Sequence, residues 1–135
     1  MPLLNFGPEY QVGVREIDTQ HINLIRLINE LHEAMRARSG KAQIESTLRR
    51  LLGYTHYHFQ TEEALMQRHA YPHRIEHHRE HAELSLRAEA LQQQLKDGEV
   101  GVVVETLDFL TQWLSHHILE SDKQLARFLN DKFIT

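Results

Sequence analysis

Cysteine is absent from this chain of 135 residues, which excludes disulfides, thiolate metal ligands and thiol nucleophiles together. No apolar run is long enough to span a membrane, and no secretory hydrophobic region follows Met1 and Pro2, so we expect a cytoplasmic protein. Basic residues form no block and the formal net charge is −4, which argues against nucleic acid as a partner. With 41% hydrophobic and 25% charged residues the composition is that of an ordinary globular protein, and we expect one domain over residues 1–135.

Histidine is the residue type that the sequence has in excess. Eleven histidines are several-fold more than ordinary usage would give, whereas lysine is scarce. A terminal tag would cluster its histidines, but these are spread from His21 to His117. We therefore expect the fold to use some of them.

Helix-breaking residues divide the chain into four long segments. The breakers are Ser-Gly at 39–40, Tyr-Pro at 71–72 and Asp-Gly at 97–98, after an irregular lead-in over residues 2–13. The segments between them are too long for strands and are rich in Leu, Glu, Gln, Arg and Ala. The expected helices run from Asp18 as N-cap to before Gly40, from Lys41 to His69, from Pro72 in the first turn to Lys96, and from Val100 to Asn130. Short turns between long helices predict an all-α fold, an antiparallel up-down-up-down four-helix bundle with an irregular N-terminal lead-in.

An apolar stripe runs along each predicted helix, and ionisable residues interrupt all four stripes. The stripes are His21, Leu24, Ile28, Leu31 and Met35; Ile44, Leu48, Leu51, Thr55, His58, Glu62 and Leu65; His77, His81, Leu84, Ala88, Leu91 and Leu95; and Val103, Leu107, Leu110, Leu114, His117, Ser121 and Leu125, with Asp122 adjoining. Ionisable groups in such positions are costly unless they are paired or bind a metal.

The interruptions fall at nearly the same depth in the bundle. Each residue rises ~1.5 Å along a helix, so an antiparallel hairpin can be folded about its turn by counting residues. The groups that meet are His21 with His58, Glu62 with His81, and His117 with His77 and His81. Asp122 falls about one helical turn away. The sequence therefore predicts one buried cluster of metal-seeking side chains.

Two motifs place pairs of ligand-type side chains on one helix face. His58 and Glu62 form H-x-x-x-E, and His77 and His81 form H-x-x-x-H. One such pair alone is weak evidence, because chance pairs are common in a histidine-rich helix. The H-E-x-x-H pattern of zinc proteases is absent, since no Glu follows the first His.

Other histidine pairs compete with these motifs. His73 also pairs with His77 at i, i+4, but it lies at the end of the predicted bundle. His116 pairs with Glu120 at the same spacing, but away from the apolar stripe. His117 and Asp122 are five residues apart, about 140° on an ideal helix, so they need either a locally widened turn or a carboxylate that reaches in from the edge. The predicted solvated histidines are His32, His56, His69 and His78.

The type of ligand restricts the metal. Five imidazoles and two carboxylates exceed a tetrahedral zinc site, and two octahedral or near-octahedral ions suit them better. Ferritin-like di-iron and di-manganese proteins need E-x-x-H twice, and no histidine here has Glu three residues before it. The predicted site is therefore rich in imidazole.

These residues resemble the hemerythrin family, specifically its single-domain bacterial members, over nearly the whole chain. The motifs that carry the resemblance are VGVREIDTQH at 12–21, HFQTEEALM at 58–66, Tyr71-Pro72 followed by His77 and His81, and WLSHHI at 113–118 followed by Asp122. The family pattern favours His117 over His116 and accepts the five-residue spacing to Asp122. Phe6 departs from the family, which often has Trp there.

The resemblance implies a centre of two non-haem iron ions (Fe2+/Fe3+) that binds O2. His77, His81 and His117 would bind one iron, and His21 and His58 the other. Both irons would share Glu62, Asp122 and an oxo or hydroxo bridge, which gives one iron six ligands and the other five. The one open position would take O2. Candidate apolar walls around it, which could also be ordinary core, are Ile25, Phe59, Trp113, Leu114 and Ile118.

Reversible O2 binding for carriage, storage or delivery is the leading hypothesis, and we expect no enzyme activity. The alternatives are a di-iron peroxidase, oxidase or nitric oxide-reactive enzyme, O2 or redox sensing through a partner protein, and a bundle with a vestigial metal site. No acid or base stands out beside the open position. We expect a monomer and leave a protein partner open.

Overall fold

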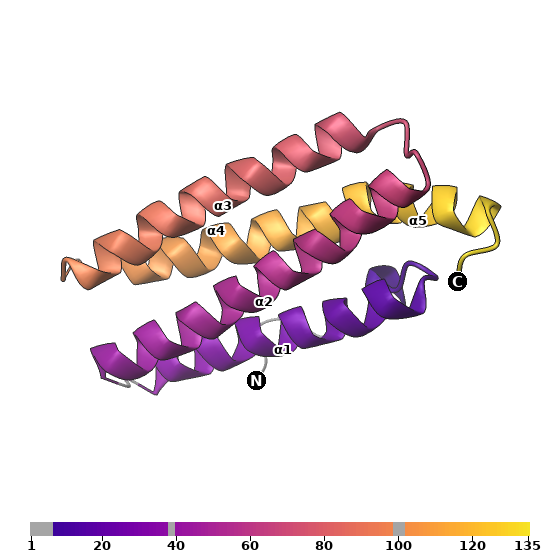
Figure 1. Ribbon diagram of the computed structural model, residues 1–135. Helices are drawn as coiled ribbons and strands as arrows, with labels where there is room; N and C mark the ends of the chain where they lie inside the picture. The colour runs from indigo at the N-terminus through magenta and orange to yellow at the C-terminus, as the bar shows by residue number, and fades with distance from the viewer. Residues whose placement is uncertain (1–6, 38–39, 99–101) are drawn as a thin grey trace.

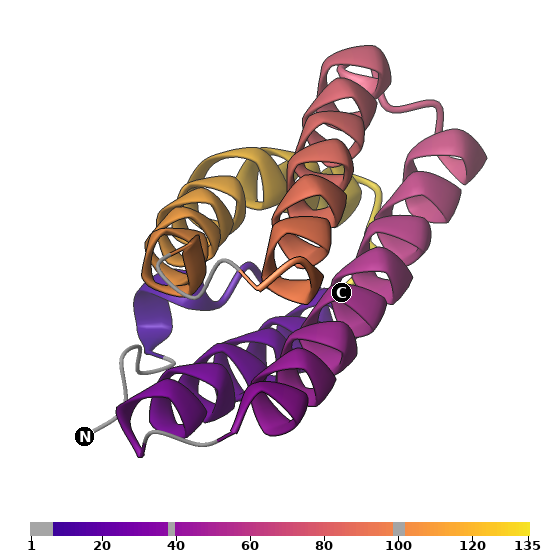
Figure 2. The same cartoon turned by 90° about the vertical axis from the view of Figure 1, so that its left-hand side faces the viewer.

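The computed structural model describes residues 7–37, 40–98 and 102–135, and the side chains of residues 102–107 lie outside that description. The elements are η1 (Pro8–Tyr10), α1 (Arg15–Arg36), α2 (Lys41–Arg68), α3 (Arg74–Lys96), α4 (Val102–His116), η2 (His117–Asp122) and α5 (Lys123–Asp131). Successive helices run antiparallel in Figure 1, and α4 continues through η2 into α5 as one rod. In Figure 2 the helices surround a common interior, and α1 and α4 are in contact. The predicted up-down-up-down bundle is confirmed.

The start of α1 differs from the sequence prediction. Asp18 was expected to cap the helix, but α1 begins at Arg15 with Val14 as its N-cap. The Asp18 carboxylate instead accepts hydrogen bonds from the N–H groups of Val12 at 2.7 Å and Gly13 at 3.2 Å. An acidic residue in the first turn that reaches back to N–H groups ahead of the helix resembles the acidic half of a capping box. Asp18 does mark the start of the helix, but it lies within the first turn and is not the N-cap.

The other boundaries lie within a few residues of the predictions. Pro72 lies in the turn before α3 and not in its first turn, because α3 begins at Arg74. The prediction that the last helix starts at Val100 lies outside the described residues, as does Phe6. The last helix ends at Asp131, one residue beyond the prediction.

The end of α4 contains a π-helical segment, η2, from His117 to Asp122. In a π-helix the backbone bond runs from residue i to i+5, so a side chain five residues on is stacked over the first as an i+4 side chain is in an α-helix. The widened turn that the His117–Asp122 spacing required is therefore present.

The described buried apolar side chains form two clusters. Leu24, Ile28, Leu51, Leu84 and Leu114 belong to the larger cluster. Ile17, Met66, Tyr71, Leu125 and Leu129 belong to the smaller one, at the end where α2 turns into α3. Along α1, α2 and the last helix, the buried histidines and carboxylates lie between residues of the larger apolar cluster and residues of the smaller one. The predicted stripes are otherwise buried or half-buried, and the side chains of Val103 and Leu107 lie outside the description.

Residues near the two ends of the described chain are joined by hydrogen bonds beside the smaller apolar cluster. The Arg15 N–H donates to the Thr135 carbonyl at 3.2 Å, and the Asn130 amide donates to the Gly13 carbonyl at 3.1 Å. Gly13 has φ +94°, and a Cβ there would lie 3.0 Å from Asn130 Oδ1. Glycine at this position thus allows both the turn and the close approach.

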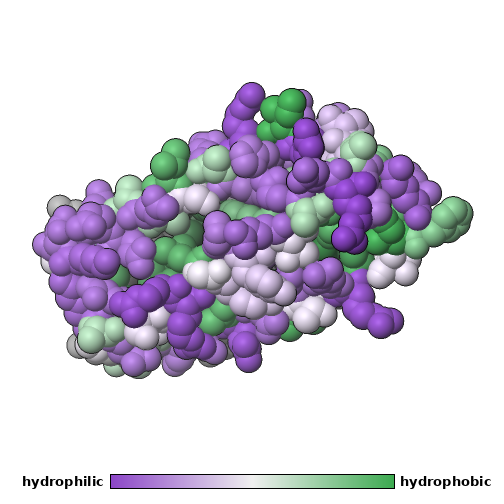
Figure 3. Space-filling view, in the orientation of Figure 1, coloured by the Kyte–Doolittle hydropathy of each residue, from purple (hydrophilic) through white to green (hydrophobic). Residues whose placement is uncertain are grey.

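The surface seen in Figure 3 is mainly hydrophilic, with scattered apolar side chains. Among the described residues, every helix is too short or too polar to cross a lipid bilayer.

Candidate metal centre

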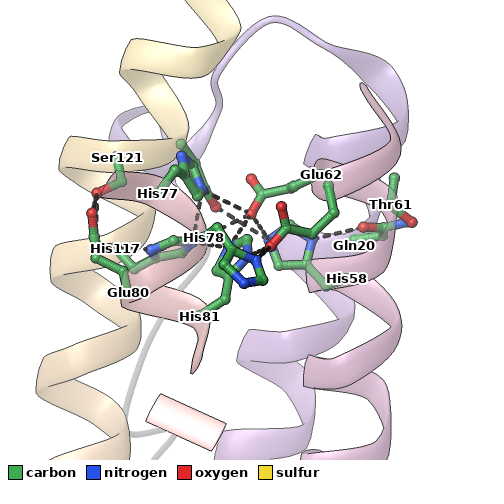
Figure 4. A network of polar contacts seen from close by, with 12 residues as sticks. Gln20, His58, Thr61, Glu62, His77, His78, Glu80, His81, His117 and Ser121 are labelled. Atoms are coloured by element: carbon green, nitrogen blue, oxygen red, sulfur yellow. Dashed lines mark hydrogen bonds and ion pairs between the residues drawn. The ribbon is translucent and has the colours of Figure 1, made fainter. Parts of the chain in front are cut away.

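All seven side chains that the sequence singled out are buried in one place. They are His21, His58, Glu62, His77, His81, His117 and Asp122, each at most 4% exposed. They come from α1, α2, α3 and η2, and Figure 4 shows those it labels pointing toward a common centre. Ionisable groups so far from water are tolerated only when they are paired or bind a metal.

Three imidazoles gather around Glu62. Its Oε1 lies 3.2 Å from His77 Nε2, 3.0 Å from His81 Nε2 and 3.3 Å from His117 Nε2. These three histidines are called the three-His group below. Together with Glu62 they bring one ligand atom each within 4.8 Å of one another, a geometry that could hold a metal ion.

Two further imidazoles gather around Asp122. Its Oδ2 lies 2.7 Å from His21 Nε2 and 3.2 Å from His58 Nε2. These two histidines, called the two-His group, form a second possible metal site with Glu62 and Asp122. Asp122 also faces the first group, since its Oδ1 lies 2.8 Å from His117 Nε2. The two carboxylates therefore lie between two adjacent sets of imidazoles.

The outer nitrogens of four imidazoles point at hydrogen-bond acceptors. His58 Nδ1 donates to the Gln20 side-chain oxygen at 2.6 Å, and His21 Nδ1 to the Tyr10 carbonyl at 3.4 Å. His81 Nδ1 lies 3.3 Å from Glu63 Oε1, and His117 Nδ1 lies 3.3 Å from Glu80 Oε1. An acceptor at Nδ1 fixes the proton there, so the lone pair of a neutral ring is on Nε2, facing the centre.

This arrangement fits a metal better than a hydrogen-bond network. The Nε2 atoms of His81 and His117 are 3.2 Å apart, so two neutral rings with their protons on Nδ1 would point lone pairs at each other and at the carboxylates. Among the described residues, no hydrogen-bond partner reaches the buried Glu62 Oε2, and none is well aligned with Asp122 Oδ1. Buried polar atoms are rarely left unpaired, and cations between the lone pairs would satisfy them.

Without metal, the carboxylates hold protons on part of the cluster. Burial and Asp122 act to raise the pKa of Glu62, but the imidazoles of His58 and His117 outweigh them and leave that pKa well below its usual value. Burial lowers the pKa of His77, but hydrogen bonds to Asp122 and Glu62 more than compensate and raise it to about 9. Asp122 likewise raises the pKa of His117 far above its ordinary value, against the effect of burial. Metal binding must displace these protons.

His81 differs from its neighbours. Burial lowers its pKa, and the nearby His117 and His77 add to that effect against the attraction of Glu62. A neutral His81 is already in the form that a metal ion binds.

The competing histidine pairs lie outside the cluster. His73 and His116 are exposed, as are His56 and His78, and the side chains of His32 and His69 are half-buried. His78 is not isolated, however. Its Nδ1 hydrogen bonds to Glu63, the same carboxylate that His81 contacts.

Sequence reasoning did not find the outer partners. Gln20 on α1 contacts His58 on α2, Glu63 on α2 contacts His81 on α3, and Glu80 on α3 contacts His117. Each partner is adjacent in sequence to a cluster residue on its own helix, and it contacts an imidazole on the next helix. A polar residue beside each ligand-type residue was the available signal.

The expected apolar wall residues belong to the larger apolar cluster or pack against it, and two of them contact the imidazoles. Ile25, Phe59, Leu114 and Ile118 are buried in the larger apolar cluster, and Trp113 is packed against it. The Phe59 ring stacks on His81 at 3.9 Å between centroids, and the Trp113 ring stacks on His117 at 4.7 Å.

Comparison with known proteins agrees with this geometry. The model of the family described as "Hemerythrin HHE cation binding domain" matches residues 12–129. The bacteriohemerythrin of Methylococcus capsulatus is 32% identical over 115 residues, which cover 85% of this chain and 87% of that protein. The bacteriohemerythrin of Stenotrophomonas maltophilia is 30% identical over 126 residues, covering 93% and 81%. A crystal structure of wild-type hemerythrin, 30% identical, superposes with a TM-score of 0.86 and covers 93% of this chain and 96% of that one. The chain therefore belongs to the hemerythrin family, whose cofactor is a di-iron centre.

Proposed function

We propose that the protein binds O2 reversibly at a non-haem di-iron centre held by His21, His58, Glu62, His77, His81, His117 and Asp122. The observation that carries the proposal is the division of five buried imidazoles into two sets, with Glu62 common to both and Asp122 in contact with imidazoles of both. A site for one ion would not need a second set of imidazoles across the same two carboxylates.

The numbers of ligands in the two sets are unequal, and this inequality gives the proposed function its basis. With two shared carboxylates and a shared oxo or hydroxo bridge, the three-His group would give its iron six ligands and the two-His group would give its iron five. One position would remain open, on the two-His side. When bound, the two irons supply the electrons that O2 needs to bind.

The residues around the cluster support reversible binding over turnover. Reversibility requires that water and protons stay away from the bound gas. Ile25, Phe59, Leu114 and Ile118 are buried and offer no proton donor, and they would help to exclude water from the centre. Of the other nearby acids, Glu63 and Glu80 face the outer nitrogens of His81 and His117. We therefore favour carriage, storage or delivery over peroxidase or nitric oxide chemistry.

Repeated oxygenation tests the proposal. The protein is reduced without air and exposed to O2, and the gas is then removed while the visible spectrum is followed. We expect a charge-transfer band that appears and disappears over several cycles. Immediate irreversible oxidation would overturn the carrier function but not the metal site, and turnover of peroxide in stopped-flow measurements would favour an enzyme.

We also propose that residues 1–135 act as a single domain, as a monomer and in the cytoplasm. Sedimentation of the iron-loaded protein tests the monomer, and fractionation of cells that express the natural protein tests the compartment. A protein partner would turn the same oxygenation into a signal, and co-purification that depends on O2 would reveal it.

A further inference from the structure

The acceptors behind the imidazoles differ in charge between the two groups. In the three-His group, the outer nitrogens of His81 and His117 face the carboxylates of Glu63 and Glu80. In the two-His group, the outer nitrogens of His58 and His21 face an amide oxygen of Gln20 and a peptide carbonyl. The asymmetry is thus two carboxylates on one side and neutral oxygens on the other.

A further hydrogen bond holds each of the three side-chain acceptors in place. Ser121 donates to the Glu80 carboxylate, with its Oγ 2.7 and 2.8 Å from the two oxygens. His78 hydrogen bonds to Glu63. On the other side, the Gln20 amide nitrogen donates to Thr61 Oγ1 at 2.9 Å, which turns the amide oxygen toward His58. The fold therefore fixes the carboxylates of Glu63 and Glu80 behind one group and the neutral amide oxygen of Gln20 behind the other.

A carboxylate behind an imidazole makes that imidazole a stronger electron donor. The carboxylate attracts the Nδ1 proton and so raises the basicity of Nε2, and the effect is larger than that of a neutral acceptor. A more basic ligand and a nearby negative charge favour the ion of higher positive charge. Glu62 lies within ligand distance of both groups, and Asp122 faces the two-His group through Oδ2 and the three-His group through Oδ1, so neither carboxylate belongs to one iron alone.

We propose that Glu63 and Glu80 are positioning residues that lower the reduction potential of the iron in the three-His group relative to the iron in the two-His group. The inference rests on the proposed di-iron centre. The iron with all positions filled would then give up its electron more readily than the iron with the open position, which would favour uptake of O2 over its release.

Stepwise reduction of the holoprotein tests the proposal. One electron converts the diferric centre to the mixed-valence form, and a second electron completes the diferrous form. The first electron goes to the two-His iron and the second to the three-His iron. A spectroelectrochemical titration gives both potentials, and electron paramagnetic resonance measures the mixed-valence form at half-reduction.

Substitutions in either group should reduce the difference between the two reduction potentials, one kind by raising the second potential and the other by lowering the first. Glu63→Gln and Glu80→Gln remove charge from the three-His side and should raise the second potential. We expect a rise of at least about 59 mV, which is a tenfold change in a one-electron equilibrium. Gln20→Glu adds charge behind His58 and should lower the first potential. Both kinds of variant should reduce the amount of mixed-valence form.

Glu83→Gln is the matched control, because Glu83 is exposed on α3, one turn from Glu80. It removes the same charge and should leave this difference unchanged. The proposal is overturned if the difference between the two reduction potentials in Glu63→Gln, Glu80→Gln and Gln20→Glu equals that in Glu83→Gln. It is also overturned if Gln20→Glu widens this difference. If all three test variants lose iron while Glu83→Gln keeps two per chain, the partners only support the ligands, and the proposal fails. Fewer than two irons in the unsubstituted protein would instead refute the proposed function.

Discussion

Oδ1 of Asp122 lies 2.8 Å from Nε2 of His117, although the two residues are five positions apart on a single helical rod. The π-helical turn of η2 makes this contact possible, because it stacks residue i+5 over residue i. The other oxygen of Asp122 is 2.7 Å from His21 Nε2. One locally widened turn thus places a carboxylate between the two imidazole groups.

Asp122→Asn should lower the iron content from two per chain to less than one. The amide keeps the shape of the side chain but removes the negative charge that faces both groups, and a neutral amide oxygen is a weaker ligand. Metal analysis of protein purified without an affinity column measures this. Asp131→Asn, an exposed substitution at the end of α5, is the control and should keep two irons. Full iron occupancy in Asp122→Asn would show that Asp122 is not a bridge.

The metal-free protein should become less stable as the pH rises from 7 to above 9. The folded pKa of His77 is about 9, against an ordinary 6.5, so the stabilisation from its protonated form is complete below about pH 6.5 and is lost as the pH rises through 9. His117 has a raised pKa and acts in the same direction. We expect the Tm to fall by roughly 5 °C over this range.

Iron binding should remove this pH dependence and release protons. At pH 8 the metal-free His77 is mostly protonated, whereas a ligating imidazole is neutral. Calorimetry in buffers with different ionisation enthalpies counts the protons released. A Tm of the metal-free protein that stays level or rises between pH 7 and 9, or metal uptake at pH 8 without proton release, would refute this account of the cluster.

Leu114→Val should speed autoxidation of the oxygenated protein several-fold and leave the iron content unchanged. The substitution removes one methylene from a buried apolar wall, at a cost to stability of about 1 kcal/mol, and the space admits water to the centre. Leu110→Val makes the same deletion about one turn farther from His117 in the same apolar cluster and should autoxidise at the unsubstituted rate. If Leu114→Val lost iron, its side chain would support the ligands and not the O2 pocket.

Two glycines should respond to alanine in opposite ways. Gly13 has φ +94° and its new Cβ would lie 3.0 Å from Asn130 Oδ1, so Gly13→Ala should destabilise the protein by about 1–2 kcal/mol. Gly53 lies inside α2, and a Cβ there would meet nothing within 4 Å. Gly53→Ala should therefore stabilise by about 0.5–1 kcal/mol. Thermal unfolding of the iron-loaded variants checks both signs, and a lower Tm for Gly53→Ala would contradict the helical assignment.

The bundle was predictable because its periodic signal is strong. The apolar stripes set which face of each helix is buried, and the Gly and Pro breakers set the turns to within a few residues. Asp18 shows where local signals mislead. An acidic residue near a helix start can cap the helix or reach back from its first turn, and only the path of residues 12–14 decides which.

The cluster was partly predictable from the level of its members along the helices. Counting residues about each turn brought six of the seven side chains to one level of the bundle, but it placed Asp122 a turn away, because counting assumes an ideal α-helix. The outer partners required the tertiary structure. Which neighbour of a ligand-type residue reaches the next helix depends on how the helices rotate and cross, and the spacing does not contain that information.

Diffraction from a crystal of the iron-loaded protein, with data on both sides of the iron absorption edge, tests the central claim most directly. The account predicts two anomalous peaks, one among Nε2 of His77, His81 and His117 and the other among Nε2 of His21 and His58, with Glu62 and Asp122 between them. A single peak, or peaks at exposed histidines such as His73 or His116, would contradict it.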